Sequence, residues 1–174
     1  MKIEKIDLIN EENIYLTTLN EKASFFRGRI VDSCISVEMR LADILTDFFN
    51  QDAIKRQFMY SSIFTNSELS FSSKAKILSE LITNFFPDVL GMFPDVVDDL
   101  RSTINLRTRI DHSMLDTSEE FTKNRYSDRI QLVYFIDGKR QLMTLTDDEF
   151  NVCMRKASKI IIALDHLKEK LNLN

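Results

Sequence analysis

Residues 21–50, EKASFFRGRIVDSCISVEMRLADILTDFFN, carry the pattern that decides the fold. Apolar side chains recur there every three or four residues, which is the spacing of one face of an α-helix. The pattern predicts one long helix whose apolar face packs against the rest of the domain. The residues of that face are Phe26, Ile30, Cys34, Val37, Leu41, Ile44, Leu45 and Phe48.

The rest of the chain also favours helices, so a mainly α fold is predicted. A length of 174 residues suits one domain with one core. Only 3 Gly and 2 Pro are present, so the chain lacks the turn residues that a many-stranded sandwich or barrel needs. We expect a bundle of four to five helices, with residues 1–20 forming an N-terminal arm or a short helix. The other helices are predicted over 52–64, from Ser72 or Ser73 to before Pro87, from Pro94 onward, and over 147–171.

One β-hairpin interrupts the helical pattern. The stretch QLVYFIDGKRQLMTL, residues 131–145, contains two β-rich runs joined by Asp137-Gly138. That pair is favoured in a type I′ turn, so a hairpin is predicted near 130–145, inserted before the last helix. Thr146 and Glu149 have the spacing of a capping box and predict the start of that helix.

The charge excludes one class of function. The formal net charge is −4, and residues 87–99 contain four aspartates without a basic residue. A protein that coats nucleic acid through bulk electrostatics should be basic, so that class is excluded. A local anion-binding site remains compatible with this balance.

No cofactor, metal or membrane segment is expected. Cys34 and Cys153 are too few for a disulfide framework or a zinc site. The longest fully apolar run, residues 160–164, is far shorter than the roughly 20 residues of a membrane span. The charged N-terminus does not resemble a signal peptide, so a soluble cytoplasmic protein is predicted. His166, in the charged terminal helix, is expected to be solvated.

The segment LRTRIDHSML, residues 106–115, holds the candidate chemistry. The Arg107 guanidinium can bind a phosphate with two hydrogen bonds, and the His112 imidazole can move a proton near neutral pH. RNA supplies its own 2′-hydroxyl nucleophile, so this pair predicts RNA cleavage without a metal. Five residues rotate a helix by about 140°, so the two side chains converge only if the helix ends near Asp111 or if two protomers combine their sites. The alternative is an ordinary helix end, with Arg107 and Asp111 forming a surface ion pair.

The stretch INLRTRIDHS, residues 104–113, resembles the R-x4-6-H signature of the HEPN superfamily (higher eukaryotes and prokaryotes nucleotide-binding). The order of RGRIVDSCISVEMRLADIL, a loop, LSFSSKAKILSEL and the Arg/His helix is similar to small bacterial HEPN-like proteins. The resemblance covers residues 22–115, and the terminal helix 147–171 completes the bundle. It implies a HEPN-like helical bundle and a homodimer whose two motifs face each other across a cleft. The implied activity is that of a metal-independent endoribonuclease from a toxin or phage-defence system, with an antitoxin or regulatory protein as a possible partner.

The resemblance also assigns roles to individual residues. Arg107 would bind and polarise the phosphate, and His112 would act as acid–base or orient the leaving group. Thr108 stands where the superfamily commonly has Asn, Asp or His, and Asp111 stands where it has a small residue and could pair with Arg107. The alternative function is a non-catalytic HEPN-like module or regulator that binds a protein partner, broadly similar to the mannitol-operon repressor family.

Glu38 is the other supporting residue, because it lies on the apolar stripe of the long helix, where a carboxylate is costly without a partner. Some superfamily members place an acidic residue beside the Arg/His pair, so Glu38 could orient Arg107. The alternative is a structural pair with Arg40, Arg101 or another cation. Basic residues near the motif are candidates for RNA contact: Arg101, Arg109, Lys123 and Arg125.

Overall fold

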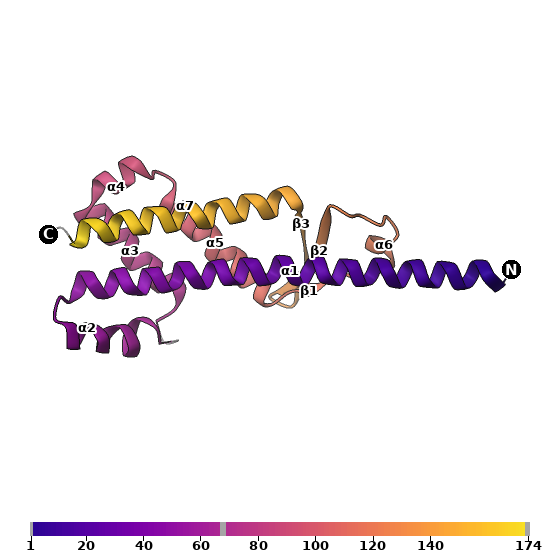
Figure 1. The fold of residues 1–174 in the computed structure, drawn as a ribbon, viewed down its shortest axis with the longest axis horizontal. Coiled ribbons are helices and arrows are strands. Elements are labelled where there is room, and N and C mark those ends of the chain that lie inside the picture. Colours follow the sequence, from indigo (N-terminus) through magenta and orange to yellow (C-terminus); the bar gives the residue numbers. More distant parts are fainter. Residues whose placement is uncertain (1, 67–68, 173–174) are drawn as a thin grey trace. The chain divides into compact units, whose positions relative to one another are not determined.

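The computed structural model describes residues 2–66 and 69–172, and side chains within 11–66 and 69–171. The fold is mainly α with a small three-stranded antiparallel sheet (Figure 1). In chain order the elements are α1 (Lys2–Phe49), α2 (Ala53–Met59), the π-helix η1 (Tyr60–Phe64), α3 (Phe71–Phe85), α4 (Pro87–Met92), α5 (Val96–Asp111), β1 (Met114–Leu115), α6 (Glu119–Thr122), β2 (Arg129–Ile136), β3 (Lys139–Thr146) and α7 (Asp147–Asn172).

The chain forms two compact units, and each contains segments that are distant in sequence. The sheet unit contains the residues up to Val31 together with Thr108–Val152. The helical unit contains Asp32–Arg107 together with the residues from Cys153 on. Each unit is described by itself below.

The helical unit has a core supplied by α1, α3, α4, α5 and α7. Its part of α1 runs alongside α7 (Figure 1), and ion pairs join Arg40 to Asp165 and Asp43 to Lys168 across the two helices. The α1 residues that face this core follow the predicted spacing of three and four. Buried apolar residues of this unit include Cys34, Val37, Leu41, Ile44, Leu45, Leu78, Leu81, Ile82, Val89, Leu100, Ile160, Leu164 and Leu167.

In the sheet unit, the first part of α1 contacts the loop before β2 and the start of α7. The ring of Phe26 stacks on that of Phe150, at the start of α7, with centroids 4.2 Å apart and an interplanar angle of 6°. Burial of two aromatic rings is a large apolar contribution to this small core. The other buried apolar residues of this unit are Leu19, Ala23, Ile30, Ile110, Phe121, Ile130, Leu132, Val133 and Leu145.

The predicted hairpin is confirmed. β2 and β3 pair in register from Arg129↔Thr146 to Ile136↔Lys139. Asp137 (φ 50°) and Gly138 (φ 72°) both have positive φ, as a type I′ turn requires. The short strand β1 pairs antiparallel with the other side of β2.

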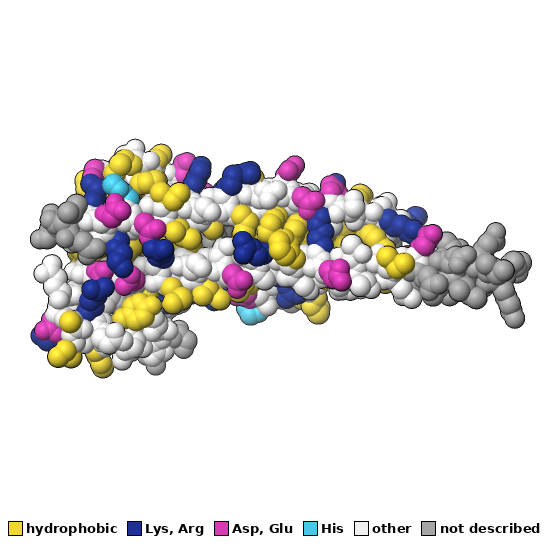
Figure 2. All heavy atoms as spheres, in the orientation of Figure 1, with side chains coloured by type: hydrophobic (Ala, Val, Ile, Leu, Met, Phe, Trp, Pro, Cys, Tyr) yellow, Lys and Arg dark blue, Asp and Glu magenta, His cyan; other side chains and the backbone are white. Residues whose placement is uncertain are grey.

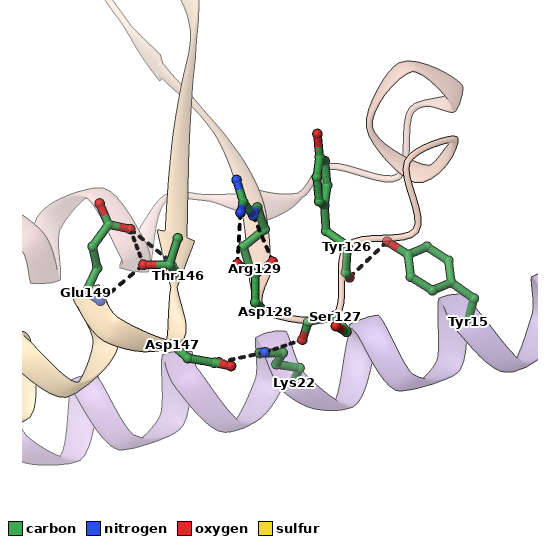
Figure 3. Close-up of polar contacts among 9 residues, drawn as sticks. All are labelled: Tyr15, Lys22, Tyr126, Ser127, Asp128, Arg129, Thr146, Asp147 and Glu149. Atoms are coloured by element: carbon green, nitrogen blue, oxygen red, sulfur yellow. Dashed lines mark hydrogen bonds and ion pairs between the residues drawn. The ribbon is translucent and has the colours of Figure 1, made fainter.

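The start of α7 is also as predicted (Figure 3). The backbone N–H of Thr146 donates to the Glu149 carboxylate at 2.8 Å, and the backbone N–H of Glu149 donates to Thr146 Oγ1 at 3.2 Å, which is a capping box. Lys22 on α1 forms an ion pair with Asp147 at 2.6 Å and donates to the backbone carbonyl of Ser127. These contacts attach α1 to the loop before β2 and to the beginning of α7.

Three predictions about the elements need correction. Residues 2–20 are the first part of α1, so they do not form a separate arm or short helix. The described residues contain more than four to five helices, because α2, α4 and α6 are short additional ones of 7, 6 and 4 residues. The starts of two helices also differ from prediction. The helix predicted from Ser72 or Ser73 begins at Phe71 with Ser70 as its N-cap, and the helix predicted from Pro94 begins at Val96. Among the described residues, the structure holds no helix with the length and hydropathy needed to span a membrane.

Candidate functional site

The helix α5 carries the predicted motif. It ends near Asp111, which is one of the two conditions under which Arg107 and His112 were predicted to converge. Its last residue is Asp111, and His112 is the first residue outside it. The backbone N–H and the hydroxyl of Ser113 both donate to the carbonyl of Ile110, at 3.2 and 2.9 Å. Arg107 belongs to the helical unit, whereas Thr108, Arg109, Asp111 and His112 belong to the sheet unit.

In the helical unit, Arg107 is part of a cluster that we call the Glu38 cluster, made of Glu38, Phe71, Lys74 and Arg107. Lys74 Nζ lies 2.6 Å from Glu38 Oε1, and Arg107 NH1 lies 2.6 Å from Glu38 Oε2. The guanidinium carbon of Arg107 lies 5.8 Å from the centroid of the Phe71 ring, within range of a cation–π interaction. One carboxylate therefore joins two cations, and an aromatic ring covers one of them.

The Glu38 cluster is largely withdrawn from water. The side chain of Lys74 is 3% exposed, that of Glu38 is 22% exposed and that of Arg107 is 27% exposed. Burial by itself would raise the pKa of Glu38, but the hydrogen bonds and charges of Lys74 and Arg107 outweigh burial and lower it. Glu38 is therefore an anion near neutral pH, and the three charged groups sum to +1.

These contacts identify the cations that compensate Glu38. Glu38 pairs with Arg107, the partner implied by the superfamily resemblance, and with Lys74, which falls under the alternative of another cation. The two named alternatives form ion pairs elsewhere, Arg40 with Asp165 and Arg101 with Asp98. The acidic residue on α1 thus fixes the position of the arginine on α5.

A groove of about 420 Å³ lies between α3 and α5 in the same unit. Small residues of α3 leave space along one wall, and α5 contributes Arg101, one of the predicted RNA-contact residues. The groove carries two cations and one carboxylate. Its lining residues are Ser72, Ala75, Lys76, Ser79, Glu80, Val97, Leu100, Arg101, Ile104 and Asn105.

In the sheet unit, His112 is exposed to solvent directly after α5, and Asp111 is exposed as well. Arg109 is exposed, and its guanidinium carbon lies 6.0 Å from the centroid of the Tyr134 ring on β2. Thr108 is exposed as well. The imidazole of His112 is thus accessible to a large substrate.

The two remaining RNA-contact candidates lie on the loop after β1. Lys123 is exposed at the end of α6. Arg125 has a positive φ of 47° and forms an ion pair with Glu11 on α1 at 3.2 Å. The visible face in Figure 2 shows acidic and basic side chains interspersed.

A second charged cluster lies in the helical unit, away from the predicted motif. Asp43 and Asp47 of α1 contact Arg56 of α2 and Lys168 of α7, with Arg56 Nε 2.5 Å from Asp47 Oδ1. Burial raises the pKa of Asp47 above its usual value, and the neighbouring Asp43 adds to that increase, while Arg56 and Lys168 oppose it. These contacts join α2 to the end of α1.

Lys74 and Phe71 belong to the Glu38 cluster but were not predicted from the sequence as site residues. The signal for Lys74 was present, because it precedes the buried Leu78 by one helical turn and so lies on the inner face of α3. The expectation that His166 is solvated is wrong at one atom, since its Nε2 is buried without a hydrogen-bond partner among the described residues. The ring of Phe93 lies 6.0 Å from the His166 ring.

Comparison of the chain with protein-family models, with curated proteins and with solved structures finds no match. The described residues contain no group of three or more His, Cys, Asp or Glu side chains placed to hold a metal ion.

Proposed function

We propose that the protein is a HEPN-like, metal-independent endoribonuclease of a toxin or defence system. The observation that carries the proposal is the ion pair between Arg107 and Glu38, in which Arg107 NH1 lies 2.6 Å from the half-buried carboxylate of Glu38. A guanidinium fixed in this way needs little reorganisation to bind a phosphate. The resemblance of residues 104–113 to the superfamily signature supplies the reaction type.

The proposed reaction uses two side chains and the RNA itself. His112 accepts the proton of a 2′-hydroxyl as the 2′-oxygen attacks the adjacent phosphorus. The bond from phosphorus to the 5′-oxygen breaks, and that oxygen takes up a proton, which leaves a 2′,3′-cyclic phosphate and a 5′-hydroxyl. Arg107 stabilises the negative charge that develops on the phosphoryl oxygens. Glu38 and Lys74 are positioning residues, because they act through Arg107.

A cleavage assay with single-stranded RNA in EDTA tests this proposal. We expect Arg107→Ala and His112→Ala each to reduce the cleavage rate by about 100-fold or more. Arg107→Ala should fold, because Glu38 keeps its ion pair with Lys74. Arg155→Ala, at an exposed position on α7, is the matched control and should cleave at the wild-type rate. Absence of cleavage by the folded wild type, or cleavage that neither substitution changes, would refute the proposal.

The second candidate function is a non-catalytic module or regulator that binds a protein partner. One observation favours it: the Glu38 carboxylate already occupies NH1 of Arg107, where it competes with an incoming phosphate. The assay separates the two functions through Glu38→Gln. In a ribonuclease this substitution alters the rate, because the arginine loses its support, whereas a binding module has no cleavage rate to alter.

A further inference from the structure

The strand β3 is an open edge of the sheet. In the strand order β1-β2-β3, one side of β3 pairs with β2, and no strand among the described residues pairs with its other side. The pairing with β2 continues through eight residue pairs without an interruption in register. A regular, unpaired strand edge presents backbone N–H and C=O groups that can recruit another strand.

This edge lacks the features that usually protect an exposed strand. β3 contains no proline, and its charged residues, Lys139 and Arg140, both lie at the turn end. The six residues that follow are uncharged, and the side chain of Leu142 near the middle is 49% exposed. Native edges are normally blunted by charges, proline or bulges along the strand, so β3 has the character of a strand that is covered by a partner.

An apolar row on the sheet ends at this edge. Met114 is opposite Val133 and Val133 is opposite Leu142, so the three residues share one face and cross all three strands. Met114 is 61% exposed, whereas Val133 in the middle of the row is 9% exposed. A strand added beside β3 would extend this row and cover Leu142.

The charges at the two ends of β3 make it complementary to a second copy of itself. The strand begins with Lys139 and Arg140, and Asp147 and Asp148 follow directly after its last residue. In antiparallel pairing, the start of one strand lies beside the end of the other. The basic end of each copy would therefore meet the acidic end of the other copy. Within its own chain Asp147 pairs with Lys22 and Arg140 pairs with Asp116, so each of these two side chains already has one partner of opposite charge.

We propose that β3 pairs antiparallel with β3 of a second copy of this chain and forms a continuous six-stranded sheet. A two-fold axis requires one residue of β3 to face the same residue of the second copy. With Met143 at this central position, the basic end of each strand lies beside the acidic end of the other. In this register Lys139 and Arg140 lie beside the end of the second copy's β3, where Asp147 and Asp148 begin its α7. The two Leu142 side chains are diagonal neighbours on the face that carries the apolar row.

This dimer differs from the one that the superfamily resemblance implies. β1, which follows His112 by two residues, lies at the outer edge of each half of the six-stranded sheet. Five strand spacings separate the two copies of β1, so they are about 24 Å apart. The two His112 residues would not face each other. The inference does not rest on the ribonuclease proposal, and its test needs no RNA.

Analytical ultracentrifugation of the full chain tests whether β3 forms the interface. We expect the wild type to sediment as a dimer, and Leu142→Lys to weaken association at least about tenfold, because it places two lysines at the paired edge. Ile14→Lys is the matched control, since Ile14 is also an exposed apolar residue of the sheet unit, 66% exposed, and should dimerise like the wild type. A monomeric wild type, or a Leu142→Lys variant that associates as tightly as the wild type, overturns the proposal.

Cysteine cross-linking tests the register in a Cys153→Ser background. Met143→Cys should form a disulfide-linked dimer under mild oxidation, because the two Cα atoms would be about 5 Å apart. Gln141→Cys, on the same face of β3, should stay unlinked, because its two copies would be offset by four residues, or about 14 Å along the strand. Cross-linking of Gln141→Cys, or its absence in Met143→Cys, would rule out this pairing.

Discussion

Replacing Glu38 with Gln would remove the carboxylate that Lys74 and Arg107 share. Loss of one partner from a buried ion pair costs about 3–5 kcal/mol, because the remaining charge stays buried without compensation. Arg107 is 27% exposed and can turn toward water, whereas Lys74 is 3% exposed and cannot. We therefore expect the free energy of unfolding to fall by about 3 kcal/mol, near the lower end of that range.

Lys74→Met is the matched variant, because it removes the buried cation and leaves Glu38 paired with Arg107. Methionine has a similar length and fills an apolar site well, so we expect a change of about 1 kcal/mol or less. The double variant Glu38→Gln with Lys74→Met should then recover about 2 kcal/mol of the loss caused by Glu38→Gln alone. That recovery would identify the uncompensated lysine as the source of the cost.

Urea unfolding at pH 7, followed by circular dichroism, measures these differences. The explanation would be refuted if Glu38→Gln lowered the free energy of unfolding by less than about 1 kcal/mol, or if Lys74→Met lowered it by more than Glu38→Gln does. The pH dependence provides a second check. The pKa of Glu38 is lowered in the folded protein, so its contribution is complete above the ordinary carboxyl pKa of about 4.3 and is lost as the pH falls through the lowered value. Glu38→Gln should lack this part of the acid dependence.

Two further predictions concern stability. Burial raises the pKa of Asp47, so its ionised form costs stability, and the free energy of unfolding should rise as the pH falls through that raised pKa. Asp47→Asn should lose this pH dependence, and its urea midpoint at pH 7 should match or exceed that of the wild type. A clearly lower midpoint for Asp47→Asn would contradict this prediction. Gly138→Ala should lower the free energy of unfolding by about 1–2 kcal/mol, because φ is +72° there, whereas Gly28→Ala in α1 should raise it by about 0.5–1 kcal/mol in the same experiment; equal effects of the two would argue against the backbone explanation.

Local patterns predicted the elements whose signals lie within a few residues. The spacing from Phe26 to Leu45 on α1, the Asp137-Gly138 turn and the Thr146–Glu149 capping box all depend on near neighbours, and the structure confirms them. Pro87 likewise separates α3 from α4. Each of these features has one dominant local cause.

The features that were missed depend on partners far along the chain. β1 has only two residues, and its pairing with Leu132 and Val133 gives it strand character, which no pattern within Met114–Leu115 indicates. The partners of Glu38 are 36 and 69 positions away, so the sequence indicated the need for a cation and left Lys74 unidentified. The beginning of α1 is rich in charge and was predicted as an arm or a short helix, although its apolar residue Leu19 is buried in the sheet unit.

The split of each unit between distant segments affects how the chain folds during synthesis. The sheet unit needs both Phe26 and its stacking partner Phe150, about 120 residues later. At a translation rate of about 5–20 residues per second, Phe150 is synthesised about 6–24 seconds after Phe26, and the apolar face of α1 stays uncovered during that time. During that interval the emerging chain exposes an amphipathic helix, so the ribosome-bound intermediate is a natural client for chaperones that shield apolar surfaces.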